Sequence, residues 1–303
     1  MVVAAAPRET AVGIKVEFHA DDYGMFPAQS RRILSCYHNG GLNGVSVMPN
    51  GDGLAECMAL LQPELKNIAV TVHLNLIEGK ALCPADAVSL LTDEEGNLNS
   101  SFGKLLLQSF LPGRKQYYLQ LRKELRAQIL AVKEYLPKDL PLRLDGHAHY
   151  HMLPVVFDAL MDVIQEEKLN VSYIRIPQEH LMLYLRNLGK LKDFAPINLV
   201  KVLILNLLAL RSRCKYGAYL DGLEKKLFLG VFLSGRMHYE NVSAVLQDAK
   251  ALAEKRGCGM ELLAHPGGVR EPEDIARITN PDDRIFLTSP MRDAEATMYE
   301  IRQ

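Results

Sequence analysis

Asp145-Gly146-His147-Ala148-His149-Tyr150-His151 is the stretch around which this sequence is organised. It holds three of the nine histidines at alternate positions, and an aspartate opens it. On an extended strand these three histidines would face one way, an alternation that need not hold beyond the strand end. Imidazole is the commonest metal ligand, and a nearby carboxylate can fix its tautomer. A solvated histidine-rich loop would look similar, so the rest of the chain has to supply partners.

The composition is that of a globular protein with a hydrophobic core. The chain has 303 residues, of which 48% are hydrophobic and 23% are charged. That length suits one large α/β barrel or two ordinary domains. The formal net charge is -1, so no overall field attracts nucleic acid or an anionic membrane. We therefore expect no nucleic-acid partner.

Cysteine usage and the N-terminus indicate a cytoplasmic protein. The five cysteines are scattered, odd in number and free of CxxC spacing, a pattern typical of reduced thiols in the cytosol. Residues 1–13 lack a basic region and a long apolar region, and we interpret them as an N-terminal tail rather than a signal peptide. We expect the folded domain over residues 14–303.

The most apolar stretch of the chain runs from Ile197 to Leu210. It is too short to span a bilayer, and Lys201 and Asn206 interrupt it. We therefore predict a core helix or a dimer-interface helix at this place. No membrane span is expected, and a homodimer is a candidate assembly.

Segments with strand character alternate with segments of helical spacing along the whole chain. Apolar, β-branched strands are predicted at residues 12–18, 44–48, 68–76, 140–144, 171–176, 226–233 and 260–264. Helical segments are predicted at residues 28–38, 54–61, 117–136, 155–167, 179–213 and 241–255. This alternation, without an internal repeat or a linker, predicts a single α/β domain of right-handed βαβ units with mainly parallel strands.

Polar residues recur where the predicted strands end. They are Asp21 and Asp22, His73, the cluster that Asp145 opens, Arg175 and His265. In parallel α/β folds the carboxyl ends of the strands meet at one edge and carry the chemistry. Asp22, His73 and His147 come from three separate strand ends and can converge on a divalent metal. A second carboxylate beside that metal can take a proton from water.

Each of these residues can also be explained by a purely structural role. The two adjacent aspartates can cap the following helix, and His73 in an apolar strand is more often a satisfied histidine of the core. Arg175 can be a buried ion-pair partner, and His265-Pro266-Gly267-Gly268 can be a structural turn. The joint pattern favours a site, because a purely structural explanation must account for every strand end separately.

Four segments, taken together, resemble one protein family. They are Ala20-Asp-Asp-Tyr-Gly24, Val72-His-Leu-Asn75, Asp145-Gly-His-Ala-His-Tyr-His-Met-Leu-Pro154 and Ala264-His-Pro266. In this order and spacing they resemble the YdjC-like carbohydrate deacetylases, which include the chitooligosaccharide deacetylases. The resemblance implies a (β/α)-barrel-like fold related to polysaccharide deacetylases. It also implies removal of an N-acetyl group from an amino sugar or oligosaccharide, the expected partner.

The resemblance also implies roles for particular residues. Asp22, His73 and His147 would bind one divalent metal ion, for which magnesium and zinc are the candidates. Asp21 would be the catalytic base and His265 the catalytic acid, and Arg175 resembles the arginine that orients the catalytic aspartate. Four further residues are expected to contact substrate or to support the metal ligands: Tyr23, Asp145, His149 and His151.

Two features depart from the family pattern, and two other functions stay open. The stretch 181–213 is long and apolar, and a further closing strand is expected after Leu287-Thr-Ser-Pro290, where the chain soon stops. One alternative is a metal-dependent hydrolase of another bond, such as a phosphoester. The absence of a P-loop and of a cationic cluster near the motifs argues against it. The other is a catalytically silent sugar-binding or regulatory protein, although every candidate catalytic residue is present.

Overall fold

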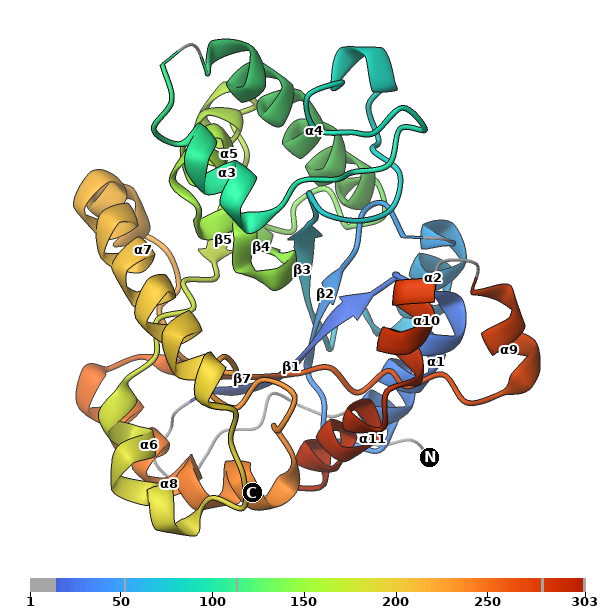
Figure 1. Cartoon of the computed structure of the whole chain (residues 1–303). Coiled ribbons are helices and arrows are strands. Elements are labelled where there is room, and N and C mark those ends of the chain that lie inside the picture. The colour runs from blue at the N-terminus through green and yellow to red at the C-terminus, as the bar shows by residue number, and fades with distance from the viewer. Residues whose placement is uncertain (1–14, 52, 113, 279–280, 302–303) are drawn as a thin grey trace.

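The computed structural model describes residues 15–51, 53–112, 114–278 and 281–301. Its centre is one seven-stranded sheet in the order β5-β4-β3-β2-β1-β7-β6, and every neighbouring pair is parallel (Figure 1). The strands are β1 Val16–Tyr23, β2 Gly44–Val47, β3 Ala69–Leu74, β4 Leu142–Gly146, β5 Val171–Ile174, β6 Lys226–Leu229 and β7 Gly259–Ala264. The predicted parallel, barrel-like α/β fold is confirmed.

The sheet follows the chain order of a barrel but stays open at one seam. The last strand, β7, pairs with β1 from Val16 to Ala20, so the first and last strands of the sheet lie side by side. The two sheet edges are β5 and β6. Helix α11, Pro290–Ala296, stands where the family pattern would place a further closing strand, so the departure noted from the sequence agrees with a barrel that stays open.

Helices lie around the outside of this sheet (Figure 1). The remaining helices are α1 Pro27–His38, α2 Leu54–Leu61, α3 Phe102–Gln108, α4 Lys115–Lys133, α5 Pro154–Glu166, α6 Leu181–Asn187, α7 Pro196–Leu220, α8 Tyr239–Arg256, α9 Pro272–Arg277 and α10 Pro281–Thr288. Several begin with proline, as α1, α5 and α7 do, because the first helical position needs no backbone N–H and favours proline's fixed φ. The predicted N-terminal tail, residues 1–13, lies outside the described residues.

Strand β1 is buried on both faces, and the two faces differ in polarity. Val16, Phe18 and Ala20 belong to the hydrophobic core. The alternate residue Glu17 accepts from Arg143 of β4 at 2.7 Å and pairs with Lys226 of β6. Successive side chains of a strand face opposite ways, so this second face lines a charged barrel interior.

Local contacts end the regular strand pattern in two segments. The predicted strand 226–233 ends at Leu229, because the next three backbone N–H groups turn to donate to the carboxylate of Glu179 at 2.6–2.9 Å. After β4 the chain forms a 3₁₀ turn, His147–Met152, in which Ala148 and His149 have φ of 49° and 60°. The alternation of the histidines therefore ends with the strand.

Helix α7 coincides with the apolar stretch of the sequence. One side packs on the protein through Val202 and Ala209, whereas Ile197 and Leu207 on the other side are 61% and 68% exposed. It is a helix with one covered and one open apolar face. Among the described residues, no helix combines the length and the apolar character that crossing a membrane would need.

Candidate active site

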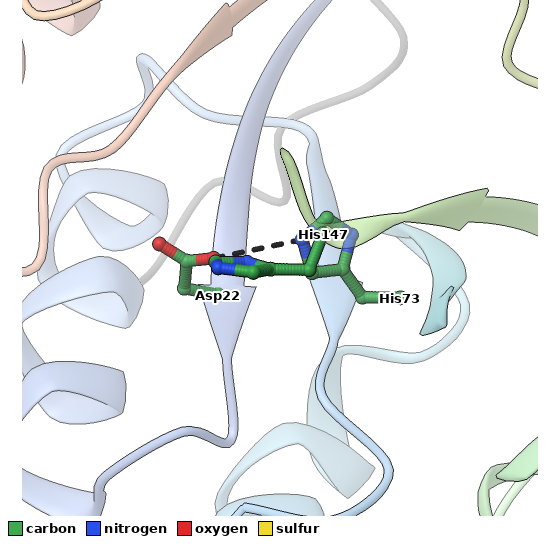
Figure 2. A group of neighbouring side chains, drawn as sticks. All are labelled: Asp22, His73 and His147. Carbon is green, nitrogen blue, oxygen red and sulfur yellow. Dashed lines mark hydrogen bonds and ion pairs between the residues drawn. The ribbon is translucent and has the colours of Figure 1, made fainter. Parts of the chain in front are cut away.

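The polar strand ends predicted from the sequence meet at one edge of the sheet. Asp22 is the last residue but one of β1, His73 lies in β3, and His147 follows β4. Figure 2 shows their polar groups facing one another. Asp22 Oδ1 lies 3.0 Å from His147 Nδ1 and 3.5 Å from His73 Nε2, and one ligand atom from each residue lies within 4.8 Å of the others.

These three residues fit a divalent metal ion. His73 Nε2 is buried and has no hydrogen-bond partner among the described residues, as expected of an atom that faces a ligand. One carboxylate and two imidazoles suit zinc and several other divalent ions. Burial would lower the pKa of His73, but Asp145 and Asp21 raise it to about 10. This strong attraction for positive charge also favours a cation, which displaces the proton on binding.

The backbone separates the two adjacent aspartates. Asp22 has φ of 66°, in the left-handed region that aspartate tolerates better than most residues. Its side chain reaches the two histidines, whereas both carboxylate oxygens of Asp21 accept from Arg175 Nη1 at 3.0 and 2.9 Å. One carboxylate can therefore bind a metal while its neighbour remains free to act on a proton.

Arg175 links Asp21 to the residues that could hold a metal ion. It is completely buried, and its Nη1 lies 2.6 Å from Asp145 Oδ2 as well as beside Asp21. Burial opposes its charge, but the carboxylates of Asp145, Asp21 and Glu261 raise its pKa well above the usual value. Asp145 in turn accepts from His73 Nδ1 at 2.7 Å, which leaves His73 Nε2 to face the metal position.

His265 lies at the end of β7 and is partly exposed. Its backbone N–H donates to Glu295 Oε2 at 2.7 Å, and its Nδ1 lies 3.2 Å from the same oxygen. Burial tends to lower the pKa of His265, but the hydrogen bond to Glu295 and the charge of Asp22 raise it above the ordinary value. His265 therefore holds a proton more tightly than an ordinary imidazole does.

Three other predicted site residues lie beside the centre or in the core. Tyr23 is fully buried and donates from its hydroxyl to the backbone carbonyl of Cys57 at 2.6 Å. His151 Nε2 donates to the backbone carbonyl of Arg175 at 2.8 Å, and burial lowers the pKa of His151 to about 4. His149 meets the ring of Phe228 edge to face, with centroids 5.6 Å apart. These contacts indicate structural support.

Five residues near the candidate active site were not predicted from the sequence. They are Ser46, Glu78, Glu261, Arg292 and Glu295. Ser46 donates to Asp145 at 2.5 Å, and Glu78 lies 3.2 Å from His147 Nε2. Glu261 carried a usable signal, because it is a charged residue inside an otherwise apolar strand. Arg292 and Glu295 carried none, since they stand in a polar segment without strand character.

Comparisons with known proteins establish the family. The family model for YdjC-like protein matches residues 15–299, so the chain belongs to the YdjC-like family. Carbohydrate deacetylase of Xenopus laevis is 31% identical over 55% of this chain and 52% of its own length. Carbohydrate deacetylase of Homo sapiens is also 31% identical, over 53% of this chain and 47% of its own length. Chitooligosaccharide deacetylase of Proteus mirabilis is 28% identical over 52% of this chain and 58% of its own. The chain thus spans about half the length of the curated relatives it matches.

A solved structure shares the fold. It is an Enterococcus faecalis protein described as a cellobiose-phosphate cleavage protein, with a TM-score of 0.63 and 16% identity. The likeness covers 95% of this chain and 90% of that one. At this identity the likeness concerns the fold alone.

Arg175→Met is expected to destabilise the protein strongly. The change removes the cation that three buried carboxylates share: Asp21, Asp145 and Glu261. Breaking a buried ion pair in this way costs about 3–5 kcal/mol of unfolding free energy, measurable by urea denaturation at pH 7. The exposed-surface variant Arg126→Met is the control and should leave the urea midpoint nearly unchanged. Equal midpoints for both variants would contradict the structural importance of the buried charge.

Proposed function

We propose that this chain is a divalent-metal-dependent hydrolase that removes an N-acetyl group from an amino sugar or oligosaccharide. The observation that carries the proposal is the convergence of Asp22, His73 and His147 beside Asp21, which Arg175 clamps. Membership of the YdjC-like family and the names of the deacetylase relatives support a carbohydrate substrate. Magnesium and zinc are the proposed ions.

In the proposed reaction Asp21 is the base. Its carboxylate takes a proton from the water molecule whose oxygen attacks the acetamide carbon, and Arg175 holds it in place for this transfer. A divalent ion held by Asp22, His73 and His147 would polarise the carbonyl and lower the pKa of water.

His265 completes the reaction as the acid. It donates a proton to the sugar nitrogen as the carbon–nitrogen bond breaks, so that acetate and a free amine leave. After the products leave, Asp21 releases to solvent the proton that it took from water, and His265 takes up a proton from solvent. The two residues thus need opposite protonation states at the start of each turnover.

Asp21→Asn is expected to lower the rate of acetate release by at least about 100-fold, because the amide cannot accept the proton. Acetate would be assayed with N-acetylated chitobiose and other N-acetyl sugars, with magnesium, zinc, manganese or cobalt added singly. Metal content should stay at the wild-type level in Asp21→Asn and fall in His147→Ala. The exposed Asp86→Asn is the matched control.

The same assay separates the alternatives. Acetate release at the wild-type rate from Asp21→Asn would remove Asp21 as the base. Hydrolysis of phosphoesters, with no acetate from any sugar, would identify a hydrolase of another bond. Binding of sugar without any turnover would identify a silent binding protein.

The pH dependence of kcat/KM is expected to be bell-shaped. Asp21 must be ionised, so activity falls at low pH. His265 must be protonated, and Glu295 raises its pKa above the ordinary value despite burial, so the basic limb should lie above about pH 6.5. Stopped-time acetate assays from pH 4 to pH 10 measure it. A rate that still rises at the alkaline end would be incompatible with His265 as the acid.

We also propose that a second copy of the chain covers the open face of α7. Ile197, Val200, Leu203, Leu207 and Leu210 are 48–68% exposed and lie at helical spacing on one face. Together they expose roughly 500 Å² of apolar surface, as large as the largest patch of a typical monomer. A standard dimer buries about 800 Å² on each partner, so this stripe would form the apolar centre of such an interface.

Leu207→Lys is expected to convert a wild-type dimer into a monomer, because it buries an unpaired charge at the centre of the interface. Sedimentation velocity at micromolar concentration measures the change. The control Leu90→Lys places the same charge on another leucine, 43% exposed, outside α7. A monomeric wild type would refute the dimer. If the wild type binds anionic lipid vesicles and Leu207→Lys does not, the exposed apolar face of α7 contacts a membrane surface instead.

A further inference from the structure

Helix α11 turns two buried charged residues toward the active site. Arg292 and Glu295 are three positions apart and therefore share one face of the helix. They are only 3% and 2% exposed, although the helix belongs to a polar segment of the chain. Arg292 contacts Asp22, and Glu295 contacts His265.

Arg292 is fixed at three points. Its Nη2 lies 3.2 Å from Asp22 Oδ2, its Nε donates to the carbonyl oxygen of Phe286 at 3.0 Å, and its guanidinium stacks 3.8 Å above the Phe286 ring. Its Nη1 is buried and has no acceptor among the described residues. Such an N–H is rare in a folded protein unless a ligand satisfies it.

The two oxygens of Asp22 are therefore divided between two partners. Oδ1 faces His147 Nδ1 at 3.0 Å and His73 Nε2 at 3.5 Å, which is the metal side. Oδ2 faces Arg292. This division leaves one oxygen for a metal ion and prevents the carboxylate from turning to offer both.

Glu295 holds His265 from the same helix. Its Oε2 accepts from the backbone N–H of His265 and lies 3.2 Å from Nδ1, while its Oε1 accepts from the backbone N–H of Met237 at 3.2 Å. A ring that donates from Nδ1 to this carboxylate has Nε2 left for proton exchange. The charged groups that act on His265 are Glu295 from α11 and Asp21 and Asp22 from β1.

We propose that α11 is the positioning element of the active site: Arg292 keeps Asp22 bound to the metal through one oxygen, and Glu295 orients the acid His265. The inference rests on the proposed function, which assigns Asp22 and His265 their roles. It adds that the segment after residue 290, which has no sequence motif, sets both the metal geometry and the alkaline limit of activity.

The Arg292 part is tested on the cobalt-substituted protein without substrate. In Arg292→Met, Asp22 can offer both oxygens to the cobalt ion, so the coordination number of cobalt is expected to rise. The visible absorption of the cobalt ion should then weaken several-fold, because higher-coordinate cobalt absorbs less. Arg292→Lys should restore part of the absorption. The control Arg270→Met removes an arginine that pairs with Asp293 on the outer side of α11 and should leave the spectrum unchanged. Identical spectra for Arg292→Met and wild type would overturn this part.

The Glu295 part is tested by NMR titration of the histidine rings in the zinc-loaded protein. The His265 signal is identified by its loss in His265→Gln. Glu295→Gln should lower the pKa of His265 by about one unit, because the charge is lost while the amide oxygen still accepts. Asp293→Asn, on the same helix but outside the site, should not. An unshifted His265 titration in Glu295→Gln would overturn the assignment.

These readouts need no turnover, so they stand apart from the proposed function. A wild type that releases no acetate would refute deacetylation, whereas the cobalt spectrum and the titration would still decide the role of α11. In an active enzyme, the basic limb of the pH profile should move downward in Glu295→Gln by the same amount as the titration. If Glu295→Gln shifts the NMR titration of His265 but leaves the basic limb of the pH–rate profile in place, His265 is not the catalytic acid.

Discussion

The centre of the structure depends on the buried guanidinium of Arg175. Arg175 lies in the barrel interior, where Asp21, Asp145 and Glu261 all surround its guanidinium. Desolvating so much charge is costly unless the groups are paired and hydrogen-bonded, and here Ser46 also donates to Asp145 and Tyr173 also donates to Glu261. The result is a barrel whose centre is held by ionic contacts while its outer layer is held by apolar packing.

Each working group of the proposed active site has a fixed partner. Asp145 holds His73, Arg175 holds Asp21, Arg292 holds Asp22, Glu295 holds His265, and Glu78 lies against His147. Groups that are oriented before the substrate arrives do not have to reorganise during the reaction. The arrangement also explains the strained φ of Asp22, because the surrounding contacts hold the carboxylate between histidines on one side and an arginine on the other.

Much of this site follows from one topological rule. Parallel strands bring their carboxyl ends to the same edge, so Asp22, His73 and His147 could be predicted to converge from their positions after apolar segments. The rule does not extend past the strand end. The backbone of Ala148 and His149 takes positive φ there, and His151 turns to the backbone of Arg175 and away from the metal position. Periodicity describes regular elements, and it gives no direction to a side chain in a turn.

The sequence by itself determined the parallel α/β architecture and the three residues that could hold a metal ion, because both are set by local patterns: strand and helix periodicity, and polar residues at strand ends. Only the tertiary structure decided where the barrel stays open, between β5 and β6, and which residues complete the site. Arg292 contacts a residue 270 positions earlier in the chain. No local pattern encodes such a contact, since it exists only after β7 has closed on β1 and brought α11 to the edge where the site lies.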